Sequence, residues 1–417
     1  MKIYNTMSRE VEEFVARGDG EVKIFTCGPS TYRRPHIGNY RTFMYEDILV
    51  RYLEYLGYRV DRVINFTDVE DKTIGEAQRQ NRTIQEITND VADHFFREAE
   101  ILGLRLPETV PRATTSIDQA VHLVQVLVEK GYAYWHEGDA FFDPRKFDGF
   151  GKLYGLDMSK WPRRRIRFRQ DTYEGNRWNR GDFILWHGEK NMDHTGDDAV
   201  WDTEIGRGRP SWNIQDPAMV TKHLGYEIDI NCGGIDNIYR HHDYNIAVIE
   251  AASGGTYANY YMHGEHLIVN GRTMSKSKGN ILYPEDVLEA EGYEPRHLRH
   301  FLTAGAHYRR KLDYTESSFR GQAERLDECR QLIGEILGSA VLNVQSDPVI
   351  ERLARNLDRD FTAFMNDDLS VGKAFEGVLR NVRDLKRWSG SRPMNRNAVN
   401  EVESRLRRID SVLGVLF

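Results

Sequence analysis

The segment from residue 22 to residue 66 constrains the fold more than any other part of the chain. Val22–Thr26 is an apolar-rich run that is typical of a buried parallel strand, and the chain breaks after it at Cys27–Ser30. A helix is expected from about Ile37, because apolar side chains then recur at helical spacing: Tyr40, Met44, Ile48, Tyr52 and Leu56. Gly57 lies where a C-terminal cap belongs, and Arg59–Phe66 follows as a second strand. The segment therefore predicts a βαβ unit.

Two short motifs far apart in the sequence predict a nucleotide site. His36–Asn39 lies at the expected start of the helix, where backbone N–H groups and the helix dipole favour phosphate. Thr273–Asn280 contains two lysines in a loop, which supplies mobile positive charge for a leaving pyrophosphate. Together they are expected to form the two halves of an ATP site that makes an acyl-adenylate.

Composition excludes several classes of protein. The chain has 417 residues, enough for two to four domains, and its three cysteines are too few and scattered for a disulfide framework. No apolar run approaches the roughly 20 residues of a membrane span, and the N-terminus lacks a signal-peptide pattern. A cytoplasmic protein without a membrane partner is expected. The net charge of −7 argues against a protein that coats nucleic acid indiscriminately.

Changes in the pattern of apolar and polar residues divide the chain into four parts. A helix is expected around Val121–Lys130 and a strand at Asp139–Asp143, in what looks like an insertion. Strand signals of a second α/β half return at Ile228–Gly234 and at His266–Val269, and the chain is expected to be helical after about Leu312. The predicted parts are residues 1–115 and 205–311 for the two halves of one α/β domain, 116–204 for the insertion, and 312–417 for a helical bundle.

An ordered series of segments resembles the signatures of the class I aminoacyl-tRNA synthetases, specifically of the cysteinyl branch. These segments are Cys27–Tyr32, His36–Asn39, Thr67–Lys72, Pro111–Thr114, Ser211–Met219, Asp229–Asn245, Thr273–Ser277 and Ala306–Arg309. The similarity runs from about residue 20 to the last residue. An unrelated nucleotide-binding α/β protein would have to reproduce the whole series in order by chance.

The resemblance implies a fold and a reaction. The fold is a Rossmann-type α/β class I synthetase catalytic domain with an insertion, followed by a C-terminal α-helical bundle. The implied enzyme is an ATP-dependent, AMP-forming ligase that uses ATP with Mg²⁺. In it, the carboxylate of an amino acid attacks the α-phosphorus of ATP, and the aminoacyl-adenylate is then transferred to an acceptor.

By the same resemblance, the nucleotide site has named residues. The catalytic residues are expected to be His36, Asn39 and Lys276, and the other ATP-binding residues are Gly38, Gly234, Asp236, Ser275 and Lys278. Asn39 stands where the family has histidine, and Thr273 where it has lysine, so the phosphate contacts are replaced by hydrogen-bonding residues. Asp236 is expected either to contact the ATP ribose or only to cap a turn.

The implied amino-acid pocket departs from the family at its metal. It comprises Cys27, Thr67, Trp212, Asp216, His241 and Asn245. The cysteinyl enzymes hold a zinc ion with two cysteines, a histidine and a glutamate, and here Asp216 replaces the second cysteine while Asn245 replaces the glutamate. Asparagine is a poor zinc ligand, so no metal is expected, although a rearranged Cys27/Asp216/His241 site stays open. Asp216 would then pair with a donor of the substrate side chain, or only with His241 or a backbone amide.

Three functions remain open at this stage. The leading one is an adenylate-forming ligase that activates an amino acid other than cysteine and transfers it to a small amine acceptor. The sequence ends where the family's helical bundle ends, as in the shortened cysteine ligase of mycothiol synthesis, which this chain resembles in plan. A synthetase that charges the acceptor end of a tRNA, and an inactive synthetase-like binding protein, are the alternatives. A monomer is expected in each case.

Overall fold

The computed structural model describes residues 1–160, 181–192, 199–275, 278–289, 292–341, 348–391 and 394–417. Its centre is a four-stranded sheet of order β10-β9-β3-β4 in which every neighbouring pair is parallel. The strands are β3 (Glu21–Thr26), β4 (Arg59–Ile64), β9 (Ile228–Gly234) and β10 (Ala258–Gly264). Helix α1 (Ile37–Tyr55) connects β3 to β4, and α6 (Asp243–Ser253) connects β9 to β10. The predicted βαβ unit is confirmed.

The second α/β half differs from the expectation in one strand. The strand expected at His266–Val269 is β11 (Leu267–Val269), which pairs with β12 (Arg272–Thr273) and β13 (Leu312–Tyr314) in a separate small sheet. The second half of the central sheet is completed by β10 instead, which the sequence analysis did not identify. Strand β10 carries two adjacent tyrosines and a histidine rather than an apolar run, so its sequence gives a weak strand signal.

The insertion forms its own antiparallel sheet, of order β5-β6-β7-β8. The strands are β5 (Ala133–His136), β6 (Asp139–Phe142), β7 (Phe183–Gly188) and β8 (Gly208–Pro210). Strand β8 lies beyond residue 204, so the sheet of the insertion extends past the boundary expected from the sequence. Helices α4 (Ile117–Glu129), α5 (Trp212–His223) and α6 pack beside it around a shared apolar core that includes Val124, Ile214 and Val248. This packing fixes the start of α5 against the sheet of the insertion, where the Ser211 N–H donates to the Leu185 carbonyl of β7 at 2.9 Å.

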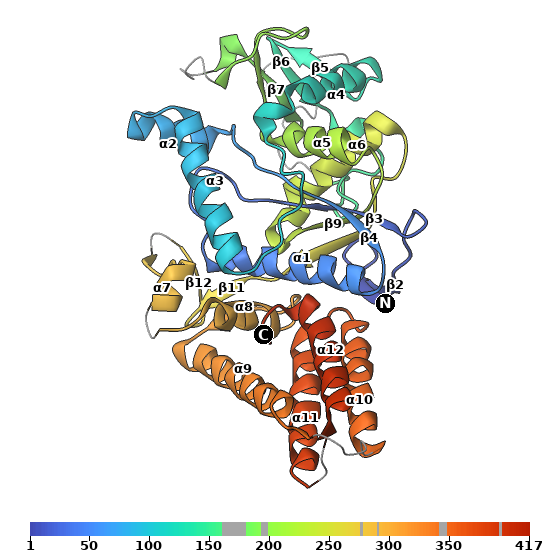
Figure 1. The fold of residues 1–417 in the computed structure, drawn as a ribbon. Coiled ribbons are helices and arrows are strands. Elements are labelled where there is room, and N and C mark those ends of the chain that lie inside the picture. The colour runs from blue at the N-terminus through green and yellow to red at the C-terminus, as the bar shows by residue number, and fades with distance from the viewer. Residues whose placement is uncertain (161–180, 193–198, 276–277, 290–291, 342–347, 392–393) are drawn as a thin grey trace.

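The remaining elements surround the central sheet (Figure 1). Helices α2 (Asp71–Gln80) and α3 (Ile84–Ile101) follow β4, α7 (Pro284–Glu289) and α8 (Pro295–Ala304) follow β12, and a hairpin of β1 (Lys2–Asn5) and β2 (Glu10–Glu13) begins the chain. The C-terminal bundle comprises α9 (Glu316–Leu337), α10 (Pro348–Met365), α11 (Val371–Ser389) and α12 (Arg396–Leu413), with short strands β14 (Ala340–Val341) and β15 (Met394–Asn395). Among the described residues, no helix is both long enough and apolar enough to cross a membrane.

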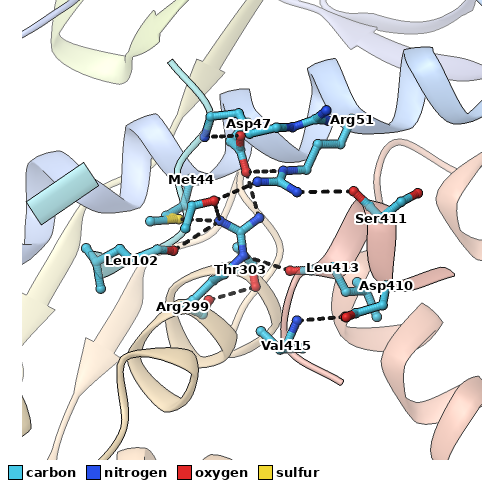
Figure 2. A network of polar contacts seen from close by, with 12 residues as sticks. Met44, Asp47, Arg51, Leu102, Arg299, Thr303, Asp410, Ser411, Leu413 and Val415 are labelled. Atoms are coloured by element: carbon cyan, nitrogen blue, oxygen red, sulfur yellow. Dashed lines mark hydrogen bonds and ion pairs between the residues drawn. The ribbon is translucent and has the colours of Figure 1, made fainter. Parts of the chain in front are cut away.

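Helix α1 is buried on both sides because it lies between the sheet and the bundle. Ile48 and Leu53 belong to the same apolar core as Phe361 and Leu379 of the bundle. A polar network joins the same elements (Figure 2). The Arg299 side chain donates to Asp47 Oδ2 at 2.6 Å and to the Leu413 carbonyl at 2.7 Å. The bundle is therefore attached to the helix that carries the expected phosphate site.

Candidate active site

A cavity of about 1160 Å³ lies at the carboxyl ends of the four parallel strands. In an open parallel sheet, ligands bind in the crevice where the strand order reverses, here between β3 and β9. Each strand delivers residues to the cavity wall from the loop that follows it. These residues are Cys27 and Gly28 after β3, Asn65 and Thr67 after β4, Gly234 and Asp236 after β9, and Gly264 and His266 at the end of β10 and just after it.

The start of α1 presents two side chains to this cavity. His36 is the N-cap, and its Nδ1 accepts the Gly38 N–H at 3.1 Å, while Asn39 Oδ1 accepts the His36 N–H at 3.0 Å. Burial lowers the pKa of His36, which favours the neutral ring. Because Nδ1 accepts, the neutral ring carries its proton on Nε2. His36 Nε2–H and the Asn39 amide are therefore donors for a phosphate at the helix N-terminus.

The loop that contains the lysines approaches the same helix. A Cβ on Gly38 would lie 2.6 Å from Cε of the flexible Met274 side chain, so the loop approaches the helix closely at this glycine. Ser275 lines the cavity, and its N–H donates to Asn280 Oδ1 at 2.9 Å. Lys276, the expected catalytic lysine, lies outside the described residues. Lys278 is exposed, donates to Thr273 Oγ1 at 3.4 Å and is not part of the cavity wall.

Gly234 and Asp236 lie opposite the start of α1. A Cβ on Gly234 would meet only Thr42 Oγ1, at an ordinary distance of 3.8 Å, so the protein alone does not require glycine there. Asp236 lies in a short 3₁₀ turn, Ile235–Asn237, and its carboxylate is 80% exposed. Its partner within the described chain is His266 Nε2, at 3.3 Å. The carboxylate therefore remains accessible to a ligand from the cavity.

The amino-acid residues expected from the sequence gather at the other end of the cavity. Thr67, Cys27 and His241 line it, and Trp212, the first residue of α5, is 36% exposed there. The Trp212 ring lies nearly parallel to the His241 ring, with centroids 5.6 Å apart and planes 16° apart. It also stacks on Tyr244 of α6, at 6.2 Å. Trp212 is thus a wall of the cavity rather than a plain core residue.

Asp216 lies behind this wall and is 1% exposed. Its Oδ1 accepts from Asn65 Nδ2 at 2.7 Å, and its Oδ2 lies 2.8 Å from His241 Nε2. Asn245 Nδ2 is 3.5 Å from the same Oδ2. Burial alone would lower the pKa of His241, but the negative Asp216 carboxylate raises it above its ordinary value. Asp216 was expected to pair either with a donor of the substrate or only with His241 or a backbone amide. The structure shows the hydrogen bond to His241.

A second histidine was not identified from the sequence. His242 Nε2 lies 3.1 Å from Cys27 Sγ, and its Nδ1 lies 2.8 Å from His263 Nε2. His263 Nδ1 in turn lies 2.8 Å from Thr6 Oγ1. Burial holds the pKa of His263 near 3 and lowers that of His242, so both rings are neutral. The adjacent pair His241–His242 in the sequence was the available signal, but only the fold shows which ring reaches Cys27.

The position of His242 adds a residue to those that could hold a metal ion. Among the described residues, the groups close enough to share one ion are Cys27, His241 and His242, whose ligand atoms lie within 4.8 Å of one another. This set contains His242 in place of Asp216 of the Cys27/Asp216/His241 alternative, and Asp216 Oδ2 also lies close to the other two members, 3.8 Å from Cys27 Sγ and 2.8 Å from His241 Nε2. The neighbouring Asp243 accepts the backbone N–H groups of Leu153 and Tyr154. Burial, followed by the nearby Asp216 charge, raises the pKa of the Cys27 thiol, which favours the protonated thiol over the thiolate.

Comparison with known proteins gives the same family along the whole chain. Residues 13–324 match the family described as tRNA synthetases class I (C) catalytic domain. A "Cysteine--tRNA ligase" of Chlamydia muridarum is 32% identical over 99% of this chain and 87% of its own length. That of Methanosarcina mazei is 33% identical over 100% of this chain and 87% of its own.

Solved structures share the fold at low identity. Mycobacterium tuberculosis methionyl-tRNA synthetase in complex with methionyl-adenylate has a TM-score of 0.66 at 15% identity, covering 95% of this chain and 90% of that one. The Agrobacterium radiobacter K84 LeuRS in its ternary complex has a TM-score of 0.70 at 11% identity, covering 97% of this chain and 85% of that one. Fold, cavity and relatives agree: the chain belongs to the cysteinyl-tRNA synthetase family of class I aminoacyl-tRNA synthetases, which are ATP-dependent ligases.

Proposed function

We propose that this protein activates an amino acid other than cysteine and transfers it to the amine of a small acceptor. The amino-acid carboxylate attacks the α-phosphorus of ATP, and pyrophosphate leaves. The acceptor nitrogen then attacks the carbonyl carbon of the adenylate. An amide bond forms, the bond to the AMP oxygen breaks, and the amine loses a proton to water. His36 Nε2–H and the Asn39 amide steady the phosphates, and Lys276 stabilises the departing pyrophosphate.

The observation that carries the substrate proposal is the position of Asp216. Both of its carboxylate oxygens have protein partners, Asn65 and His241, so it is not an unsatisfied buried charge. It orients His241, and His241 is a polar group that lines the cavity beside Trp212. We therefore expect the preferred amino acid to carry a hydrogen-bonding side chain that contacts His241. Direct pairing of a substrate amine with Asp216 is less well supported, because the carboxylate lies behind the wall.

An amino-acid-dependent ATP–pyrophosphate exchange screen over the common and several non-protein amino acids tests this proposal. We expect the fastest exchange with a polar side chain, and Asp216→Ala should reduce its advantage over a small neutral amino acid by at least about tenfold. Asp229→Ala is the matched control, because Asp229 is an equally buried carboxylate that accepts two backbone N–H groups away from the pocket. Strongest exchange with cysteine, or an unchanged ranking in Asp216→Ala, would contradict the proposal. No exchange with any amino acid would favour the inactive alternative.

We also propose that the pocket works without zinc. The reason is that Asp216 and Asn245 stand at two positions where the cysteinyl family has zinc ligands. Metal analysis of protein purified without chelator is expected to find less than one zinc per chain. One tightly held zinc per chain would contradict this, and loss of that zinc in His242→Ala would place it in the Cys27/His241/His242 cluster.

The ribose hydroxyl of a tRNA end is the second candidate acceptor. The relatives favour it, since they are cysteine–tRNA ligases. The two candidates differ in the second half-reaction alone. Release of AMP from the enzyme–adenylate complex on addition of small amines supports the first, and release on addition of tRNA alone supports the second.

A further inference from the structure

A second cleft, of about 490 Å³, opens beside the active-site cavity. It lies between α2, α3 and the residues that precede α7. Figure 1 shows these three helices on the same side of the catalytic domain. Five residues line both the cleft and the cavity: Tyr32, Arg33, Arg34, Ile281 and Tyr283. A ligand bound in this cleft can therefore extend into the cavity where the adenylate forms.

The cleft is lined by more arginines than carboxylates, although the whole chain carries a net charge of −7. Four arginines line it, Arg33, Arg34, Arg79 and Arg82, against the two carboxylates of Glu76 and Asp90. We refer to it as the arginine cleft. A cleft lined mainly by one sign of charge concentrates ligands of the opposite sign.

The arginines differ in how free their guanidinium groups are to bind a ligand. Arg34 has a structural role, because its guanidinium pairs with Glu98 of α3 and with Glu285 of α7. Arg79 pairs with Glu76, and Arg82 lies 2.7 Å from Asp90.

Such surface pairs contribute only about 0–1 kcal/mol each, so a phosphate can replace the carboxylates of Glu76 and Asp90. Arg33 has no carboxylate partner among the described residues, and its guanidinium lies over the Tyr32 ring, 5.2 Å from the centroid. Arg79, Arg82 and Arg33 are therefore the available cations.

A further cation continues the path into the cavity. Lys72 Nζ lies 5.1 Å from the centroid of the same Tyr32 ring, and Lys72 lines the cavity itself. Tyr32 thus holds one cation of the arginine cleft and one of the cavity. Basic side chains therefore extend from Arg79 and Arg82 past Arg33 to Lys72 in the wall of the active-site cavity.

We propose that the arginine cleft binds a phosphate group of the acceptor, and that the acceptor is a small phosphorylated amine. Guanidinium groups bind phosphate through paired, charge-assisted hydrogen bonds, and the size of the cleft fits a small molecule. With its phosphate held there, the amine nitrogen reaches the adenylate carbonyl, forms the amide and releases AMP. This inference rests on the transfer reaction proposed above. The other source of the same phosphate chemistry is the 3′ end of a tRNA.

The proposed function and this inference are tested by different half-reactions of the enzyme. Pyrophosphate exchange needs no acceptor, so it reports activation alone. AMP release from the enzyme–adenylate complex is measured with amines in matched pairs: ethanolamine against O-phosphoethanolamine, and glucosamine against glucosamine 6-phosphate. At least one phosphorylated member should act at a roughly tenfold lower concentration than its neutral partner, the value of one charge-assisted hydrogen bond. Inorganic phosphate should compete with it. Total tRNA is tested in parallel.

The double substitution Arg79→Ala/Arg82→Ala should reduce the concentration advantage of the phosphorylated amine in AMP release to less than about threefold. The rate of pyrophosphate exchange should change less than about twofold, because neither residue lines the ATP cavity. Arg355→Ala is the matched control, since Arg355 and Arg79 are both 60% exposed and both pair with a glutamate on their own helix. Equal action of neutral and phosphorylated amines, or an advantage that survives the double substitution, would overturn the inference. AMP release by tRNA with no response to any phosphorylated amine would overturn the small-acceptor assignment.

If no amino acid supports exchange, the proposed function fails first, and the cleft is then tested by calorimetry with glucosamine 6-phosphate. Binding that the double substitution weakens at least about tenfold supports the cleft. Absence of binding overturns it.

Discussion

Glu46 and Asp47 are neighbouring buried carboxylates on α1 with opposite electrostatic surroundings. Glu46 is fully buried, its Oε1 has no hydrogen-bond partner among the described residues, and Arg62 approaches its Oε2 only to 3.4 Å. Burial therefore raises the pKa of Glu46 to about 8, against the opposing charge of Arg62. Burial would also raise the pKa of Asp47, but two arginines, Arg299 and Arg51, hold it below its ordinary value.

The raised pKa of Glu46 predicts a stability that depends on pH. Between its ordinary value near 4.5 and about 8, the folded protein holds a proton on Glu46 that the unfolded chain has lost. The free energy of unfolding should therefore fall as pH rises through this window, by up to about 1.4 kcal/mol per pH unit from this group. Glu46→Gln should remove that part of the slope. Denaturant unfolding of both proteins at several pH values measures it, and parallel slopes would contradict the assigned pKa.

The residues of the pocket were predictable from the sequence only in part. Cys27, Thr67, Trp212 and His241 stand in matched motifs, and the structure places all four on one cavity. Asn65, which holds Asp216, escaped notice because it lies just before the matched segment and reads as a strand-end residue. Hydrogen-bond partners that come from distant elements produce no recognisable spacing pattern in the sequence.

Helix α1 shows what periodicity can and cannot predict for an element. Its apolar positions and its start were correct, and the C-terminal glycine Gly57 adopts the expected left-handed conformation, with φ of 96°. Its polar positions would be expected to face solvent, yet Arg41, Glu46 and Asp47 are buried. Periodicity identifies one covered face, whereas this helix is covered on two by the sheet and the bundle.

The start of α1 and the lysine loop should act together on pyrophosphate. Lys276→Ala is expected to lower the rate of exchange by at least about 10², the usual cost of losing one charge-stabilising donor. Asn39→His should change it much less, because one donor replaces another. Lys278→Ala is the control within the same loop, since Lys278 is exposed and outside the cavity wall. Equally small effects from Lys276→Ala and Lys278→Ala would show that the loop does not reach the pyrophosphate.

At the scale of the whole molecule, the network of Figure 2 joins the catalytic domain to the bundle. Arg299 bonds both Asp47 of α1 and the Leu413 carbonyl at the end of α12, and both charged side chains are almost fully buried. Removing one member of such a pair leaves an uncompensated buried charge. The attachment of the bundle therefore depends on this pair being complete.

Asp47→Asn is accordingly expected to destabilise the protein by about 3–5 kcal/mol, as for other broken buried pairs. The double variant Asp47→Leu/Arg299→Met should recover part of that loss, because it removes both charges of the Asp47–Arg299 pair and leaves Arg51 as the remaining cation without Asp47. Denaturant unfolding of Asp47→Leu, Arg299→Met and the double variant forms a thermodynamic cycle that isolates the coupling. Additive losses in the double variant would show that the two side chains do not depend on each other.

The central pairing of β3 with β9 also determines when the protein can fold. Lys23 N–H donates to Asp229 Oδ2 at 2.7 Å across 206 positions of the chain, and the whole insertion lies between them. During synthesis, β3 and β4 emerge long before the strand that completes the sheet beside them. Such distant pairings form slowly and leave strand edges exposed meanwhile. The order of synthesis thus leaves one edge of the nascent half-sheet unpaired until the ribosome has passed residue 234, and a chaperone that shields this edge would act before then.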